Sequence, residues 1–227
     1  MLLKIALIFL FLLGFEDMAS CDDVTVQIKL NPPFQTGKDN LKTLLDKRYS
    51  CRSFLEKKIK LDDLTAIIWY CCGEKTNSAS GSRTIPSAGA IYPLELYVLV
   101  GKDCVDNLKE GIYHYIVKEH SLRLVKEGEW RQQLKNACLN QNFIAEAPVS
   151  LVIAAQFART ANRYHERAQR YVYMEAGHAC QNIYLAAADL NLATVEIGAF
   201  SDDKLKDTIG LPEDYTPIAV MPIGYAK

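Results

Sequence analysis

The fold is decided by the stretch Arg83-Thr-Ile-Pro-Ser-Ala-Gly-Ala-Ile-Tyr-Pro-Leu-Glu-Leu-Tyr97, in which a turn of small residues leads into an apolar run. The turn, residues 86–90, reads Pro-Ser-Ala-Gly-Ala, so it has little side-chain bulk and its backbone can approach a flat ligand closely. Pro93 follows, and residues 94–100 have the apolar character of a strand. The stretch therefore predicts a ligand-facing turn at the start of a strand.

Two other segments are informative because one precedes this turn in the sequence and the other follows it. Upstream lies Arg48-Tyr-Ser-Cys-Arg52, and downstream lies Glu196-Ile-Gly-Ala-Phe200. In the first segment, two guanidinium groups with a hydroxyl between them suit a terminal phosphate, which Arg binds in a forked, charge-assisted geometry. The alternative is a solvated cationic helix end, which the neighbouring Lys47 and the pair Lys57-Lys58 also fit.

The ordered set of three segments resembles the FMN-dependent nitroreductase superfamily, and most closely its SagB-type dehydrogenases, named after an enzyme that matures a peptide toxin. The resemblance runs from about Leu41 to Lys227. Further matching segments are Gly111-Ile-Tyr-His-Tyr115, Arg163-Tyr-His-Glu-Arg-Ala-Gln-Arg-Tyr171, Glu175-Ala-Gly-His178 with Gln181-Asn182, and Gly198-Ala-Phe-Ser-Asp-Asp203. It implies an interwound homodimer with two FMN sites at the interface.

The resemblance also implies which residues meet FMN. They are Arg48, Ser50 and Arg52 at the phosphate and ribitol, Pro86, Ser87, Ala88 and Gly89 reaching in from the partner subunit, Ile197, Gly198 and Ala199 along the isoalloxazine edge, and Lys227 as late positive charge near the phosphate. A backbone N–H of residues 197–199 would bond flavin N5, and a glycine lets the main chain lie close. The alternatives are an ordinary loop before a strand for residues 86–89, and for residues 197–199 a helix-leading loop capped by Ser201 or Asp202.

Two departures from the family pattern bear on activity. Ala90 stands where many nitroreductases have Asn, although the SagB-like branch lacks that Asn as well. Arg163 and Tyr164 stand where azoline-oxidising members have a Lys-Tyr pair. Lys can act as a base when burial lowers its pKa, whereas Arg, with a pKa of about 12 or higher, cannot. Azoline oxidation is therefore not expected, and Arg163 and Tyr164 remain as catalytic candidates beside the alternative of a charged helix entrance.

The N-terminus predicts export. Residues 5–15 are apolar apart from Gly14, a run too short to span a bilayer and typical of a signal peptide. Met18-Ala-Ser-Cys21 is similar to a lipobox, which would make Cys21 a lipidated first residue and attach the protein to a membrane. We predict a signal peptide at residues 1–20, a tether at 22–38 and one domain at 39–227. If the first segment is misread, the protein is an uncleaved anchor or cytoplasmic.

Composition excludes several classes of function. At 49% hydrophobic and 23% charged, the 227 residues fit one globular domain, and a net charge of −1 gives no reason to expect nucleic acid. The four His form no ligand pair and no C-x-x-C occurs, so no metal site is expected. Most cysteines suit small hydrophobic positions, with one disulfide possible in an exported protein: Cys51, Cys71, Cys104, Cys138 and Cys180.

Hydrophobic periodicity predicts an α+β fold, with a central mixed or antiparallel sheet flanked by helices. Helices are expected at 39–47, from Leu61 to Cys71, at 130–139 and at 171–190, where small residues line one face. Strands are expected at 94–100, 149–155, 194–197 and 218–223, with a hairpin of 111–117 and 121–125.

These patterns predict an FMN-dependent oxidoreductase that transfers hydride between flavin N5 and a small electron-poor or peptide-derived substrate. The electron donor would be NAD(P)H or, outside the cytoplasm, another reductant. One alternative is a flavin-binding protein that has lost turnover, motivated by Ala90 and Arg163. The other is a SagB-type azoline dehydrogenase, which Arg163 opposes.

Overall fold

The computed structural model describes residues 40–75 and 81–227, so the predictions for the signal peptide, Cys21 and the tether lie outside the described residues. The helices are α1 (Asn40–Lys47), α2 (Leu61–Cys72), α3 (Arg131–Ala137), α4 (Asn142–Glu146), α5 (Phe157–Tyr164), α6 (Ala168–Asp189) and α7 (Asp202–Ile209), with short 3-10 turns η1 (Ala88–Ala90), η2 (Val117–Glu119) and η3 (His165–Arg167). The strands are β1 (Leu94–Val100), β2 (Gly111–Ile116), β3 (Ser121–Glu127), β4 (Val149–Ala155), β5 (Ala193–Thr194) and β6 (Thr216–Gly224).

The strands form one sheet in the order β3-β2-β1-β4-β6-β5, and every neighbouring pair is antiparallel. In β1, Val98 pairs with Tyr113 of β2 on one side and with Leu151 of β4 on the other. Both faces of β1 and β4 are covered, which is why these strands read as continuous apolar runs rather than alternating ones. The α+β fold is confirmed.

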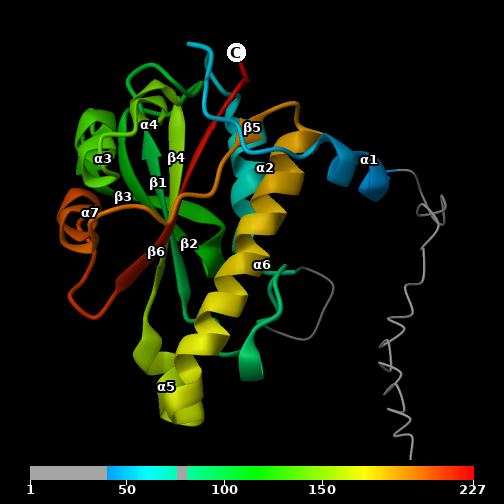
Figure 1. Ribbon diagram of the computed structural model, residues 1–227, viewed down its shortest axis with the longest axis vertical. Coiled ribbons are helices and arrows are strands. Elements are labelled where there is room, and N and C mark those ends of the chain that lie inside the picture. Colours follow the sequence, from blue (N-terminus) through cyan, green and yellow to red (C-terminus); the bar gives the residue numbers. More distant parts are fainter. Residues whose placement is uncertain (1–39, 76–80) are drawn as a thin grey trace, which may run out of the picture. The chain divides into compact units, whose positions relative to one another are not determined.

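Helices cover the two faces of the sheet differently (Figure 1). On one face, α2 and α6 pack over a core that includes Ile67, Val98 and Ile183. On the other face, α3, α4 and α7 enclose a second core around Leu134 and Val152. Each helix hides an apolar stripe against the sheet, and this burial supplies most of the folding free energy.

The longest helix, α6, begins at Ala168, three residues before the expected start. Ala168 is buried while Gln169 and Arg170 are exposed, so the helical pattern of burial already begins at Ala168. Sequence analysis had interpreted this charged segment as the entrance to the helix. Ala176 and Ala179 are buried towards the sheet, as the small-residue face predicted.

Helix α5 was not predicted, because its sequence is mostly polar and Thr160 is its buried residue. Aromatic edge contacts tie α5 to α6: the rings of Phe157 and Tyr173 lie 5.7 Å apart and those of Tyr164 and Tyr171 lie 4.9 Å apart. Packing against α6 therefore stabilises α5, a helix that the hydrophobic periodicity of its sequence does not predict.

Helix α7 follows the loop that sequence analysis treated as helix-leading. Ser201 occupies the N-cap position but makes no side-chain cap hydrogen bond. Asp202 and Asp203 in the first turn complement the helix dipole instead. The helix ends at Gly210, whose φ of 78° is the left-handed geometry that glycine adopts without strain.

The cysteines within the described ranges are all free, so no disulfide forms among them. Those that are buried behave as the expected small hydrophobes, together with Cys72: Cys51, Cys71, Cys138 and Cys180. Cys104 is half-buried. In the part of the chain that the structure describes, no helix combines the length and apolar character needed to cross a membrane.

Candidate functional site

The Arg48–Arg52 segment follows α1 and is held against β5. The Cys51 N–H donates to Thr194 O at 2.9 Å, and Ser50 and Thr194 form a parallel bridge. Ser50 and Arg52 are exposed and Arg48 is half-buried. The backbone of this segment is thus fixed, while the guanidinium and hydroxyl groups remain available to an anion.

Tyr184 of α6 connects this segment to the loop after β5. Its phenol oxygen lies 3.0 Å from Ser50 Oγ and accepts the Glu196 N–H at 2.8 Å. The Arg48 guanidinium carbon lies 5.2 Å from the centre of the same ring. One buried tyrosine therefore fixes the relative position of two segments that sequence analysis assigned to opposite ends of a flavin.

The loop from Glu196 to Ala199 exposes main chain at its centre. Ile197 is buried and exchanges both backbone hydrogen bonds with Val220 of β6, at 2.9 and 3.0 Å. Its amide is therefore committed to the sheet, and Ile197 anchors the loop. Gly198 and Ala199 are exposed, and a Cβ built on Gly198 would meet no atom within 4 Å. The structure leaves open space against the main chain at Gly198.

The C-terminus lies beside the cationic segment. The Lys227 N–H donates to Ser53 O at 3.1 Å, and Ala226 bridges Phe54. Lys227 is exposed, and its backbone hydrogen bond to Ser53 places it next to the segment that carries Arg52. Arg48, Ser50, Arg52, Gly198, Ala199 and Lys227 all belong to segments that these hydrogen bonds hold together.

The turn at residues 86–92 has an unusual backbone. Gly89, Ala90 and Tyr92 all have positive φ, at 63°, 53° and 52°. Only glycine adopts this region without strain, so Ala90 and Tyr92 cost on the order of 1 kcal/mol each. Ser87 Oγ accepts the Tyr92 N–H at 2.9 Å and closes the turn.

The two catalytic candidates, Arg163 and Tyr164, pack against that turn. A Cβ on Gly89 would lie 2.7 Å from Arg163 Nη1 and 2.8 Å from the Tyr164 hydroxyl. The Arg163 guanidinium carbon is 5.4 Å from the centre of the Tyr164 ring. The structure therefore brings together the predicted 86–89 turn and the predicted 163–164 pair, and glycine at position 89 makes room for both side chains.

Glu175 of α6, which sequence analysis named only within the matching segment Glu175-Ala-Gly-His178, is a buried carboxyl. Its Oε1 atom has no hydrogen-bond partner among the described residues. Burial raises the pKa of Glu175 to about 7, against the lowering effects of the Ser87 hydrogen bond and of Arg83. His178, in the same matching segment, lies on α6 and is exposed.

The two groups of candidate residues lie at different places on α6. Tyr184 contacts the cationic segment and Glu175 contacts the 86–92 turn. Nine positions along a helix correspond to about 14 Å of axis and about two and a half turns, which puts the two residues on opposite sides of the helix. Within one chain the turn and the cationic segment are therefore on opposite flanks of the helix.

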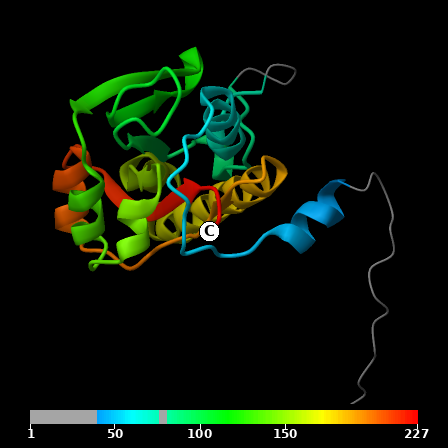
Figure 2. The ribbon, with the colours of Figure 1, turned by 90° about the horizontal axis from the view of Figure 1, so that it is seen from above.

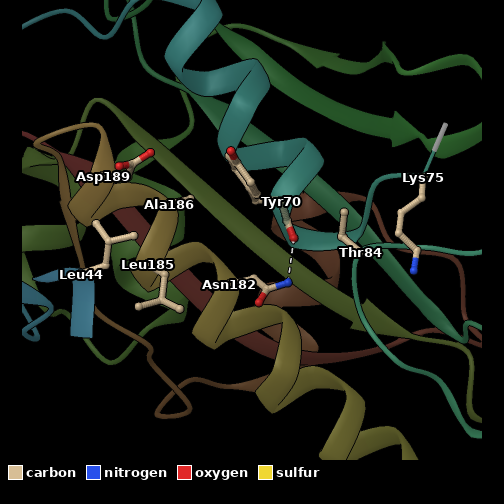
Figure 3. A pocket seen from close by; sticks show the side chains of 8 residues that line it. All are labelled: Leu44, Tyr70, Lys75, Thr84, Asn182, Leu185, Ala186 and Asp189. Atoms are coloured by element: carbon tan, nitrogen blue, oxygen red, sulfur yellow. Dashed lines mark hydrogen bonds between the residues drawn. The ribbon is translucent and has the colours of Figure 1, made fainter. Parts of the chain in front are cut away.

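A hollow of about 350 Å³ lies between α2 and α6 (Figure 3). Its lining is mainly apolar and comes from Leu44, Tyr70, Lys75, Thr84, Asn182, Leu185, Ala186 and Asp189. Asn182 Nδ2 donates to Tyr70 O at 3.0 Å across it. Nothing in the sequence pointed to this hollow, because its residues come from four separate segments.

Other chemistries find no support in the described ranges. Nowhere among these residues do three or more His, Cys, Asp or Glu side chains gather as a metal site would need. Burial raises the pKa of Cys138 to about 12 and also raises that of Cys180, so neither thiol is an activated nucleophile.

Residues 45–225 match the profile of the nitroreductase family. A protein of Methanocaldococcus jannaschii that is provisionally named a nitroreductase is 41% identical over 184 residues, which cover 81% of this chain and 90% of that protein. The trifolitoxin-processing protein TfxB of Rhizobium leguminosarum is 30% identical over 149 residues, 61% of this chain but 39% of its own length. A crystal structure from Ralstonia eutropha, also provisionally named a nitroreductase, superimposes with a TM-score of 0.72 at 27% identity, covering 87% of this chain and 88% of that one.

Proposed function

Because the chain belongs to the nitroreductase family, on its SagB-like branch, we propose that this oxidoreductase carries FMN and passes hydride between flavin N5 and a small electron-poor or peptide-derived substrate. The observation that carries the proposal is the open main chain at Gly198, held by Tyr184 beside a cationic segment. A flat ring and a charged tail on one ligand match these two neighbouring features.

The phosphate would be held by the cationic segment. Arg48 and Arg52 supply forked donors, Ser50 supplies a hydroxyl, and Lys227 adds positive charge from the adjacent C-terminus. Such charge-assisted hydrogen bonds are stronger than neutral ones and select a phosphate ester over an uncharged ligand. FMN rather than riboflavin is therefore the expected flavin.

The ring edge would lie along Gly198 and Ala199. Because the Ile197 amide is already bonded to Val220, the donor to flavin N5 belongs to one of the two exposed residues that follow. Gln141 Nε2 donates a hydrogen bond to Ala199 O at 3.2 Å and helps to fix this main chain. The flavin supplies hydride transfer, and the protein orients it and tunes its potential.

The second wall of the site would come from a partner copy. The 86–89 turn lies on the far flank of α6 from the cationic segment of its own chain, so a turn from another copy is needed to meet the ring. Exposed apolar side chains fit such an interface: Leu41 and Leu45 on α1, Tyr70 on α2, and Tyr173 and Met174 on α6. Helix α1 lies away from the sheet, beside the C-terminal end of α6 (Figure 2). The hollow between α2 and α6 would receive apolar side chains of the second copy.

On the substrate side, Tyr164 would stack on the substrate or donate a proton, and Arg163 would hold an anionic group. Both contact the turn that we place at the ring. An arginine side chain does not serve as a base at neutral pH. A SagB-type azoline dehydrogenase remains the second candidate because TfxB is a trifolitoxin-processing protein, but it would need a base other than Arg163.

We also propose export, with attachment to a membrane through a lipidated Cys21. The apolar run at residues 5–15 and the cysteine at position 21 support this location. Nicotinamide nucleotides are scarce outside the cytoplasm, so an exported enzyme would use another electron donor. Metabolic labelling with a palmitate analogue, compared between the wild-type chain and Cys21→Ser, tests the attachment.

The experiment that tests the function is an anaerobic FMN titration followed by a redox cycle. We expect the purified protein to bind FMN, to be bleached by a reductant from a panel that includes NADH and NADPH, and to be reoxidised by a nitroaromatic or a quinone. Arg52→Ala should weaken FMN binding by about 1.5–3 kcal/mol, as loss of a charge-assisted hydrogen bond predicts, whereas Lys58→Ala, an exposed cation nearby, should not.

Each outcome separates the candidates. Protein that binds no FMN refutes both catalytic readings and the flavin-binding alternative. Bound FMN that no donor reduces and no acceptor reoxidises favours a protein that has lost turnover. An Arg52→Ala variant with wild-type affinity contradicts the phosphate assignment alone.

A further inference from the structure

Arg159 of α5 contacts the start of β1 and the residue before β6 with one guanidinium group. Its Nη1 donates to Glu95 Oε1 of β1 at 2.6 Å, and its Nη2 donates to the Tyr215 hydroxyl at 2.9 Å. Its Nε donates to Gln156 Oε1, just before α5, and Nη1 also lies 3.5 Å from Tyr92 O at the end of the 86–92 turn. All three nitrogen atoms are therefore engaged within the chain, as expected of an arginine that fixes structure rather than one that binds a ligand.

Glu95 is the residue that holds this arginine in place. Its side chain is 14% exposed, and its carboxylate is shared between Arg159 and His114 of β2, whose Nε2 lies 2.8 Å from Oε2. A largely buried ion pair is costly to break, because loss of one partner leaves the other charge without compensation. The pair of Arg159 and Glu95 thus forms a fixed connection between α5 and the sheet.

This connection lies next to the 86–92 turn because two strand ends meet there. Leu94 of β1 pairs with Ala155 of β4, and the Gln156 N–H donates to Pro93 O at 3.0 Å. The turn ends just before β1 begins, and α5 begins just after β4 ends. The turn and the helix therefore leave the sheet from neighbouring strand ends.

The two catalytic candidates follow Arg159 on the same helix, four and five positions later. Arg163 Nη1 and the Tyr164 hydroxyl would lie 2.7 and 2.8 Å from a Cβ on Gly89, so both side chains pack against the turn. Arg163 is exposed, and within the described ranges it makes no ion pair. Positions four apart lie on one face of a helix, so the orientation that α5 takes at Arg159 also sets where Arg163 points.

We propose that Arg159 is a positioning residue, which sets the orientation of α5 through its ion pair with Glu95 and thereby places Arg163 and Tyr164 against the 86–92 turn. This inference deepens the proposed function. Its consequence for catalysis rests on that function, because Arg163 would hold an anionic group of the substrate at this place.

The variant Arg159→Lys separates geometry from charge. It keeps a cation beside Glu95, but a single ammonium group cannot reproduce the planar fork that reaches Glu95, Gln156 and Tyr215 together. The helix should therefore remain attached to the sheet while its orientation becomes less well defined. Glu95→Gln removes the charge of the partner instead and should have the same effect on α5.

The first test needs no flavin and follows the Gly89 and Gly198 amide resonances in protein labelled with ¹⁵N-glycine. We expect Arg159→Lys and Glu95→Gln to shift the Gly89 resonance and to leave that of Gly198, in the other proposed half-site, unchanged. Asn162→Ala, at an exposed position of the same helix, should move neither resonance. If the Gly89 resonance of both network variants coincides with that of the wild type, Arg159 does not position α5.

The second test compares two acceptors of nearly the same shape, the anionic para-nitrobenzoate and the neutral para-nitrobenzamide, with the reductant that bleaches the bound FMN. Misplacement of Arg163 weakens only the contact with the carboxylate. In Arg159→Lys, KM should therefore rise about fivefold for para-nitrobenzoate and stay unchanged for the amide, whereas a general loss of stability would affect both acceptors alike.

Equal changes in KM for the two acceptors, or no change for either, would contradict the inference. If the wild-type protein binds no FMN or turns over neither acceptor, the proposed function fails. The Gly89 resonance then still decides whether Arg159 positions α5, because that measurement requires neither flavin nor substrate.

Discussion

Tyr184 shows how much of the candidate site depends on a single side chain outside it. The residue lies on the buried side of α6, yet its hydroxyl is shared between Ser50 and the Glu196 amide. A helix that packs against the sheet thereby fixes the distance between the cationic segment and the open loop. Residues on rigid elements position a site more accurately than residues on loops do. Here the Tyr184 hydroxyl fixes two loops to a helix.

Tyr184→Phe should keep the fold and loosen this connection. Removing the hydroxyl leaves the Glu196 amide without its acceptor, at a cost of about 1–2 kcal/mol in the free energy of unfolding. FMN affinity should fall as well, because Ser50 and Gly198 are no longer fixed relative to each other. Urea unfolding measures the first effect and flavin fluorescence the second. Tyr173→Phe, at an exposed position of the same helix, is the matched control. Identical behaviour of the two variants would show that Tyr184 has no such role.

Glu175 makes the stability of the protein depend on pH. Its pKa of about 7 lies above the ordinary value of 4.5, so the folded state binds the proton more tightly than the unfolded chain. The free energy of unfolding should therefore fall as the pH rises from about 4.5 to about 7, by a contribution on the order of 3 kcal/mol. Ionisation of Glu175 thus weakens the fold while it strengthens the Ser87 hydrogen bond.

Urea unfolding at several pH values checks this contribution. Glu175→Gln carries a permanently neutral side chain and should lose that part of the pH dependence, whereas Glu166→Gln should retain it. Parallel pH profiles for the two variants would mean that Glu175 titrates as an ordinary carboxyl in the folded protein.

Sequence analysis could name the residues that would touch a ligand but not those that hold them. Arg48, Ser50 and Gly198 are visible because their residue types and order carry a resemblance. Tyr184 and Glu175 lie in a helix whose period is explained by packing, so no pattern distinguishes their polar ends from other core side chains. Their roles come from contacts with residues that are distant in the sequence. Tyr184 and Ser50 are more than a hundred positions apart, and Glu175 and Ser87 are nearly ninety positions apart.

At the scale of elements, the loop after β5 and the 86–92 turn use glycine for opposite reasons. Gly198 lies against open space, whereas Gly89 has a φ of 63° and lies against Arg163 and Tyr164. A side chain at position 198 would occupy only the space proposed for the ring. A side chain at position 89 would strain the backbone and displace two neighbours.

Gly198→Val should therefore leave the ligand-free protein as stable as the wild type, within about 0.5 kcal/mol, and abolish or strongly weaken FMN binding. Thermal unfolding and flavin titration measure the two quantities on the same preparation. Gly89→Ala provides the contrast, because it should lower the unfolding midpoint even without flavin. If Gly198→Val binds FMN as the wild type does, the ring does not lie against this main chain.

The elements themselves were predictable where hydrophobic periodicity is strong. The bounds of β1 and β4 match the predicted strands, and α6 differs by only a few residues. Helix α5 was missed because its contacts with α6 are aromatic edges at its ends rather than an apolar stripe. The last strand is longer than expected because Thr216 and Pro217 pair with Ala155 and Ala154 beyond the apolar run.

For the whole molecule, the decisive point is that the two proposed half-sites of one chain lie on opposite flanks of α6. Residue order in the sequence predicts both halves but not their separation, which follows from the nine positions between Glu175 and Tyr184. A flavin that binds to Arg52 and is covered by a Pro86–Gly89 turn therefore requires two copies of the chain. Exposed Met174 and Leu41, 57% and 59% accessible, are consistent with a surface that a second copy covers.

Complementation between two variants that each lack one proposed half-site decides whether the flavin site is shared between two copies of the chain. Arg52→Ala removes the phosphate contact and Ala88→Trp obstructs the turn, so each homodimer should bind FMN at least about tenfold more weakly than the wild type. A heterodimer purified through two different tags contains one site with both defects and one site with neither, and it should bind about one FMN per two chains. If the heterodimer binds no more flavin than its parents, the site is built within one chain, and the central claim is wrong.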